Sequence, residues 1–194
     1  MNFFKKLFNI SSQEESHIQK QNVRLSLDDL FVHNFVEKGG KFLYCLKKEE
    51  VLQNINNILK ENNWSKVFLL DQKLSKLINK KQAEIVTRIS LDVPVFTSCE
   101  HLIADKGDVL FSSNQLASRK LTEYPDNFIV FATTSQLVKD TGQGLTGIKT
   151  NSKSNLPTNI SSVKNYVLNK SDDNFLNYGN SNSKNLYLLL LEDL

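Results

Sequence analysis

Hydrophobic residues recur at helical spacing in two segments near the start of the chain. The first helix is predicted between Ser26, which can form a capping box with Asp29, and the pair Gly39–Gly40. Its apolar residues are Leu27, Leu30, Phe31 and Phe35. A second helix is predicted over residues 48–63 because its apolar residues again share one face. They are Val51, Leu52, Ile55, Ile58 and Leu59.

Short and nearly continuous apolar runs predict buried strands. They occur at residues 41–46, 66–70, 93–96, 108–113, 128–132 and 186–193. Such runs are typical of parallel sheets that are covered on both faces. Helical segments are also predicted at 71–80, 98–104 and 135–140. This alternation of helices and strands predicts one α/β domain, built around a largely parallel sheet that is flanked by helices.

Two regions fall outside this alternation. Residues 139–185 are rich in Asn, Ser, Gly and Lys, and we expect a long loop there that is functional or disordered. Residues 1–22 are expected to be a tail, frayed or locally docked, or a short amphipathic helix for a partner or a membrane surface. That helix would carry Phe3, Phe4, Leu7 and Phe8 beside Lys5 and Lys6. The domain itself is predicted to cover residues 23–194.

Composition narrows the class of protein. The chain has 194 residues, and its net charge of +3 comes from 24 basic and 21 acidic residues that are scattered along it. Without a basic cluster, nucleic-acid binding is not predicted. Cys45 and Cys99 lie far apart, so we expect no zinc site and no iron–sulfur cluster in this chain. No apolar run reaches the about 18 residues of a membrane span or resembles a signal peptide, which favours a cytoplasmic protein.

One glycine motif has the spacing of a nucleotide-binding loop. Gly142, Gly144 and Gly147 match G-x-G-x-x-G. The motif does not directly follow a predicted strand, and the region near Val167 offers no acidic residue for a ribose. We therefore expect the end of a helix and a flexible turn here.

A second candidate follows the predicted strand at 93–96. Cys99, Glu100 and His101 bring a thiol, a carboxylate and an imidazole to a strand end, where open α/β sheets bind ligands. The alternative is structural, because Thr97 and Glu100 can form a capping box at the start of the helix predicted over 98–104. Adjacent side chains on a helix also diverge.

The stretch ADKGDVLFSSNQLASRKL offers a third candidate. A Gly turn leads into a strand that ends in Ser112, Ser113 and Asn114, and Arg119 follows. Hydroxyl and amide groups beside a guanidinium are the components of an anion site. The alternative is a hairpin and a loop with a surface arginine. The residues alone favour neither interpretation.

This stretch, together with TEYPDNFIVFATTSQLV and LPTNIS, resembles the LUD domain of the lactate utilisation proteins, in particular lactate utilisation protein C. In that family a helix passes through a turn into a strand, followed by an arginine and a proline before the next strand. The corresponding residues here are Ile103, Ala104, Asp105, Gly107, Arg119 and Pro125. The resemblance extends over about residues 30–194.

The resemblance implies a fold similar to the superfamily of ribose-phosphate isomerases and CoA transferases. It also implies a role in oxidising L-lactate to pyruvate with iron–sulfur partner proteins, while this chain binds no cofactor itself. A small anionic ligand is expected near Ser112, Ser113, Asn114 and Arg119, with Asn159, Ser161 and Ser162 closing over it.

The C-terminal part departs from the family pattern. The family commonly continues with Gly-Pro-Ser, Asp-Ile-Glu and Gly-x-His-Gly-Pro segments, and Tyr178 stands where that histidine is expected. This departure points to a different substrate or an accessory role. Two alternatives therefore accompany the lactate hypothesis: a non-catalytic interaction subunit, and an enzyme acting on a CoA ester or a sugar phosphate.

Overall fold

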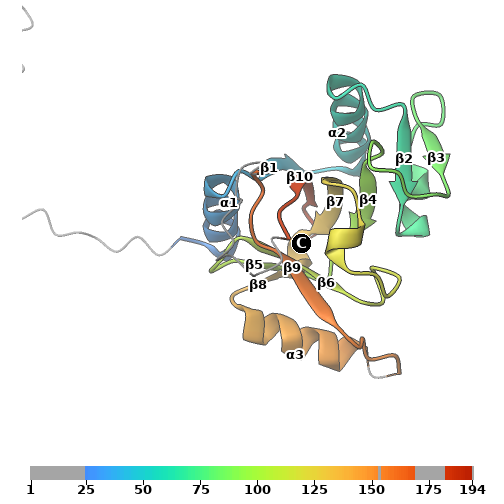
Figure 1. Ribbon diagram of the computed structural model, residues 1–194. Coiled ribbons are helices and arrows are strands. Elements are labelled where there is room, and N and C mark those ends of the chain that lie inside the picture. The colour runs from blue at the N-terminus through green and yellow to red at the C-terminus, as the bar shows by residue number, and fades with distance from the viewer. Residues whose placement is uncertain (1–24, 153, 169–181, 194) are drawn as a thin grey trace, which may run out of the picture.

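A computed structural model describes residues 25–152, 154–168 and 182–193 (Figure 1). Its helices are α1 (Leu27–Glu37), α2 (Lys48–Glu61) and α3 (Thr141–Asn151), with short 3₁₀ helices η2 (Gln72–Leu77), η3 (Leu121–Glu123) and η4 (Thr134–Gln136). Its strands are β1 (Lys41–Cys45), β2 (Lys66–Leu69), β3 (Glu84–Val86), β4 (Val95–Ser98), β5 (His101–Ile103), β6 (Asp108–Ser112), β7 (Asn127–Thr133), β8 (Leu137–Val138), β9 (Ile160–Val163) and β10 (Asn185–Leu191). The tail or helix predicted for residues 1–22 lies outside the described residues.

A six-stranded parallel sheet forms the centre of the single domain, in the order β1-β10-β7-β4-β2-β3. The predicted α/β class is therefore confirmed. One face of the sheet packs against α2 and η2. The other face packs against α1 and a second sheet, and Figure 1 shows α3 beyond that sheet.

The connections between parallel strands follow one handedness. From β1 to β2 and from β2 to β3, the chain crosses the face covered by α2 and η2. From β4 to β7 and from β7 to β10, it moves in the opposite direction across the other face. Steps in opposite directions over opposite faces have the same hand, as parallel crossovers require.

The second sheet has four strands in the order β8-β5-β6-β9. It includes residues for which the sequence predicted a helix and a long loop. Residues 98–104 are not a helix: His101–Ile103 form β5, which pairs antiparallel with β6. Residues 139–185 are not one long loop, because they contain α3 and β9. The apolar pattern there is weak because α3 buries only Gly144 and Ile148, and β9 is a short edge strand.

Two other helix predictions were also wrong in part. Within 71–80 only η2 is helical, and it is a 3₁₀ helix that Asp71 caps by accepting a hydrogen bond from the Lys73 amide. Within 135–140 the chain forms the end of η4 and then β8. The helix at Ser26 is confirmed, since the Ser26 hydroxyl accepts a hydrogen bond from the Asp29 amide at 3.3 Å.

The glycines of the nucleotide-like motif lie inside α3, and two of them, Gly144 and Gly147, serve packing. A Cβ at Gly144 would lie 3.1 Å from Ile103 Cδ1, and one at Gly147 would lie 2.7 Å from His101 Nε2. Small residues therefore let α3 approach the second sheet closely. The expected helix end at this motif was wrong, since α3 continues to Asn151.

Candidate functional site at the carboxyl edge of the sheet

The carboxyl ends of the parallel strands meet at one edge of the central sheet, and polar residues gather there. Open α/β sheets bind ligands at this edge, where neighbouring strands send their connections to opposite faces. Here β2 leads to η2 on one face, whereas β4 leads to β5 on the other. The pair β2 and β4 therefore marks the first place to look for a site.

Asp71 and Ser98 occupy that place. Asp71 follows β2, and Ser98 is the last residue of β4. The Ser98 hydroxyl donates a hydrogen bond of 3.0 Å to Asp71 Oδ2, while Asp71 Oδ1 accepts one from the Lys73 amide. The carboxylate is thus held in a fixed orientation between the two strands.

A second carboxylate lies at the ends of β7 and β10. Asp193 Oδ1 accepts hydrogen bonds from the Thr134 hydroxyl at 2.7 Å and the Ser135 amide at 2.9 Å. Its Oδ2 accepts one from the Ser135 hydroxyl at 2.7 Å. These donors, the Ser135 hydroxyl foremost, hold the pKa of Asp193 well below its usual range. Asp193 is therefore an acceptor at neutral pH and not a general acid.

Cys99, Glu100 and His101 do not form one reactive group. Cys99 is 3% exposed, and burial raises the pKa of its thiol far above the usual value, so the thiol stays protonated and is a poor nucleophile. His101 Nδ1 lies 3.3 Å from the Gln136 carbonyl oxygen, next to α3. The Gln136 side-chain amide donates instead to the carbonyls of Cys99 and Glu100.

Glu100 has a different partner from the one predicted. No capping box forms, because Thr97 lies in β4 and its hydroxyl donates to the Ser98 carbonyl. The Glu100 carboxylate accepts a hydrogen bond of 2.5 Å from the buried Ser112 hydroxyl at the end of β6. This contact brings the first residue of the predicted anion site next to the carboxyl end of β4.

The structure brings Ser113 and Asn159 together, and the hydrogen bonds between them join the hydroxyl and amide of Ser113 to the backbone of Asn159. The Ser113 hydroxyl accepts bonds from the amides of Thr158 and Asn159 at 3.0 and 3.3 Å. The Ser113 amide donates to the Asn159 carbonyl at 2.8 Å. Asn114 donates its side-chain amide to the Asn155 carbonyl. These hydrogen bonds join the loop that follows β6 to the loop that precedes β9.

Ser161 and Ser162 lie in β9 opposite Phe111 and Leu110 of β6, and both are partly buried. They belong to the second sheet and not to the 113–118 turn. Arg119, in contrast, lies on the surface directly after that turn. No ion pair of Arg119 occurs within the part of the chain that the structure describes.

The turn before Arg119 has an unusual backbone. Ala117 and Ser118 have φ of 46° and 61°, in the left-handed region that residues with a side chain rarely adopt. The Ser118 amide donates to the Ser113 carbonyl at 2.8 Å, and the Arg119 amide donates to the Leu116 carbonyl at 2.9 Å. These bonds hold the strained turn in place. Such strain is concentrated at functional sites in many proteins.

Comparison with known proteins identifies the family. The family model of the LUD domain matches residues 68–191. The chain belongs to the LUD-domain family. A crystal structure of a DUF162 family protein from Deinococcus radiodurans has a similar fold, with a TM-score of 0.60 and 12% identity over 88% of this chain and 100% of that one. A search of curated proteins gave no significant match.

The LUD-domain match begins within β2 and is shorter than the resemblance over residues 30–194 suggested. It includes the carboxyl ends of β2, β4, β7 and β10 but excludes α1, β1 and α2. The edge described above therefore lies within the matched domain, except for Asp193, which comes two residues after the match ends. Across residues 25–152, 154–168 and 182–193, no helix is long and apolar enough to cross a membrane.

Sequence reasoning missed the two carboxylates at this edge. Asp71 directly follows the strand predicted over 66–70 and Asp193 ends the strand predicted over 186–193, and a carboxylate at a strand's carboxyl end was the signal that could have found them. Gln136 was missed because it fell in a segment predicted as helix. Among the described residues, no group of three or more His, Cys, Asp or Glu side chains is arranged to hold a metal ion.

Proposed function

We propose that this LUD-domain protein is a component of L-lactate or related hydroxy-acid utilisation in the cytoplasm. Membership of a family that is associated with lactate utilisation supports this proposal. In it, the chain binds a small anion, and iron–sulfur proteins carry the electrons. Cys45 and Cys99 pack in separate core clusters on opposite faces of the central sheet, which supports a division in which partners supply the clusters.

The observation that carries the proposed ligand site is the position of Arg119. Its exposed guanidinium follows a strained turn, and that turn is held by the Ser113 carbonyl. A guanidinium binds a carboxylate through two parallel hydrogen bonds. The surface position leaves both bonds available to a ligand.

The other predicted site residues take supporting roles in this proposal. Ser113 and Asn159 join the 113–118 turn to the strand β9, and Asn114 ties it to Asn155. Ser112 is fully buried and donates its hydroxyl to Glu100, so it supports the site through that carboxylate. A 2-hydroxy acid offers a carboxylate for Arg119.

Isothermal titration with L-lactate and pyruvate tests the site. We expect the wild-type protein to bind at least one of them, and Arg119→Ala to lose at least about 1.5 kcal/mol of binding energy, as for a charged hydrogen bond. Arg88→Ala is the matched control, because Arg88 is also exposed but lies in the loop between β3 and β4. No binding by wild type, or equal loss in both variants, contradicts the ligand role.

The partner role needs a separate experiment. The tagged full chain is incubated with extract of the source cells under anaerobic conditions, and the iron and sulfide content of the captured proteins is measured. Recovery of an iron–sulfur protein at a defined ratio to the chain is expected. Recovery of proteins without iron contradicts the electron-transfer part of the proposal while leaving the ligand site to its own test.

A further inference from the structure

The strand β1 is an edge of the central sheet with one unpaired side. Among the described residues it pairs with β10 alone. The Cys45 carbonyl accepts from the Glu192 amide, so Cys45, and with it Leu43, directs its backbone groups toward β10. Backbone directions alternate along a strand. The amides and carbonyls of Phe42 and Tyr44 therefore point outward.

Between Lys41 and Leu46, this edge lacks the features that normally prevent association. Edge strands are usually protected by charged residues, Pro or bulges. After Lys41 the strand reads Phe-Leu-Tyr-Cys and continues into Leu46. Tyr44 and Leu46 are 44% and 59% exposed. Only Leu46 is closed off, because its amide donates to the Glu50 carboxylate at 2.7 Å. The open part of the edge is thus confined to Phe42 and Tyr44.

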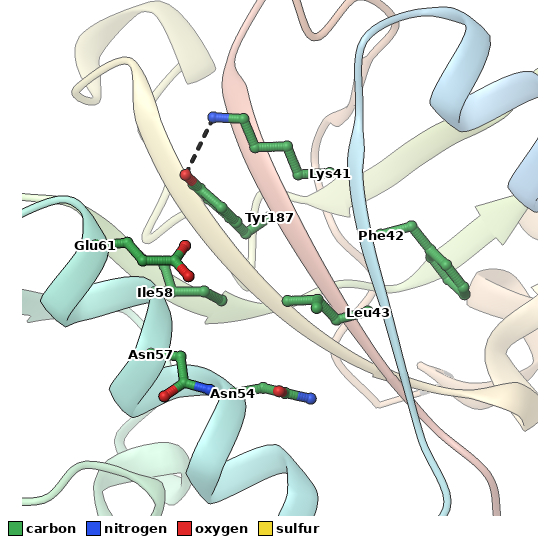
Figure 2. A pocket seen from close by; sticks show the side chains of 8 residues that line it. All are labelled: Lys41, Phe42, Leu43, Asn54, Asn57, Ile58, Glu61 and Tyr187. Atoms are coloured by element: carbon green, nitrogen blue, oxygen red, sulfur yellow. Dashed lines mark hydrogen bonds between the residues drawn. The ribbon is translucent and has the colours of Figure 1, made fainter.

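A groove runs beside β1 on the face of the central sheet that packs against α2. A pocket of about 390 Å³ lies between β1 and one flank of α2, with Leu43 and Ile58 beside it. Figure 2 shows the side chains that line it. Lys41 reaches across β10 to the Tyr187 hydroxyl at 3.1 Å, and Phe42 points away from the helix. The sheet face next to the open edge is therefore uncovered and has room for side chains of an added strand.

We propose that two copies of this chain associate by antiparallel pairing of β1 with β1, which joins their central sheets into one. With Leu43 on the two-fold axis, Phe42 of each copy lies opposite Tyr44 of the other. Residues that lie opposite each other in this way exchange both backbone hydrogen bonds. The outward amides and carbonyls of Phe42 and Tyr44 are the groups that this register requires.

The side chains suit this register as well. Phe42 and Tyr44 lie on the same face, with ring centroids 6.4 Å apart, so pairing brings four aromatic rings together across the axis. On the opposite face, Lys41 of one copy lies opposite Cys45 of the other, and the Lys41 ammonium stays bonded to Asn185 and Tyr187 of its own β10. The edge is therefore self-complementary, because the Phe42–Tyr44 pair occurs twice under the two-fold axis, and this favours a second copy over an unrelated strand.

Sedimentation equilibrium of the full chain tests the proposal. We expect a mass of twice 22.2 kDa at micromolar concentration. Tyr44→Lys places two like charges at the interface and removes two aromatic pairs, so it should raise the dimer dissociation constant by about 50-fold or more. Leu91→Lys is the matched control, because Leu91 is 79% exposed in the loop before β4, and it should remain dimeric.

Hydrogen exchange provides the second measurement. In the dimer the amides of Phe42 and Tyr44 should be protected, and in Tyr44→Lys the Phe42 amide should exchange at least 10-fold faster while the β7 amides stay protected. A monomeric full chain overturns the proposal. So does a dimer that Tyr44→Lys leaves intact, and so does a dimer that appears only after residues 1–24 are removed, which would show that this segment covers the edge.

Discussion

The buried hydroxyl of Ser112 donates a hydrogen bond of 2.5 Å to the carboxylate of Glu100. This contact connects the end of β6 with the short link between β4 and β5, at the edge where α/β proteins bind ligands. It also changes the role of Ser112, from a predicted ligand for an anion to the partner of an acid. Loss of this hydrogen bond should therefore reduce the stability of the protein.

Ser112→Ala should lower the free energy of unfolding by about 1–2 kcal/mol, because the half-buried Glu100 carboxylate loses its donor. Urea denaturation followed by circular dichroism measures the change. Ser90→Ala, at an exposed position between β3 and β4, is the control and should change stability by less than about 0.5 kcal/mol. Equal stabilities of the two variants would show that the contact is energetically neutral.

Gly107→Ala should destabilise the domain by about 3 kcal/mol or more, since Gly107 has φ of +64° and a Cβ would lie 2.5 Å from the Phe35 backbone nitrogen. Neither the turn nor α1 can move far, because both are tied to the core. Gly142→Ala, at the exposed start of α3, meets only the Asp140 side chain at 3.2 Å and should change stability by less than about 1 kcal/mol. Thermal denaturation measures the stability of both variants, and equal melting temperatures would contradict the prediction.

Ser118→Gly should stabilise the protein by about 1 kcal/mol, because glycine adopts a φ of 61° without strain while the Ser118 amide keeps its bond to Ser113. Ser90→Gly should instead lower the free energy of unfolding by a few tenths of a kcal/mol, because glycine increases the entropy of the unfolded chain. Melting temperatures compare the two. If Ser118→Gly gains stability but weakens lactate binding, the strained turn positions Arg119.

Stability should fall at alkaline pH because of Tyr166. Burial, with the nearby Asp108 charge, raises the pKa of its hydroxyl well above the usual value, and the hydroxyl donates to the Gly107 carbonyl at 2.6 Å. Above about pH 10 the unfolded chain releases this proton while the folded chain keeps it, so unfolding becomes easier as pH rises. Urea denaturation between pH 8 and about 11 should show a shallower decline for Tyr166→Phe than for wild type.

The central sheet was predictable because its strands are buried on both faces. Residues 66–70, 93–96 and 128–132 form continuous apolar runs, and all three became parallel strands. The second sheet was not predictable in the same way. Its strand β5 has three residues, and its edge strand β9 reads Ile-Ser-Ser-Val, so neither carries a strong pattern. Their pairing depends on β6, which is distant from β9 in sequence.

The proximity of two predicted site residues depends on the second sheet. Ser113 and Asn159 were grouped through the family resemblance, and they lie together because β6 and β9 are neighbours. The sequence did not reveal that the hydroxyl of Ser113 would bond to backbone amides, since those bonds depend on the antiparallel register. Whether Arg119 and its neighbours bind an anion stays a prediction.

The place of β10 between β1 and β7 has a consequence for synthesis on the ribosome. Lys41 in β1 and Asn185 in β10 are 144 positions apart, yet β1 pairs with no other strand among the described residues. While the chain is being translated, β2, β3, β4 and β7 can assemble and α1 can contact the β5–β6 turn, but β1 must wait until β10 has emerged. During that interval an unpaired apolar strand is exposed on the nascent chain, where chaperones recognise such segments.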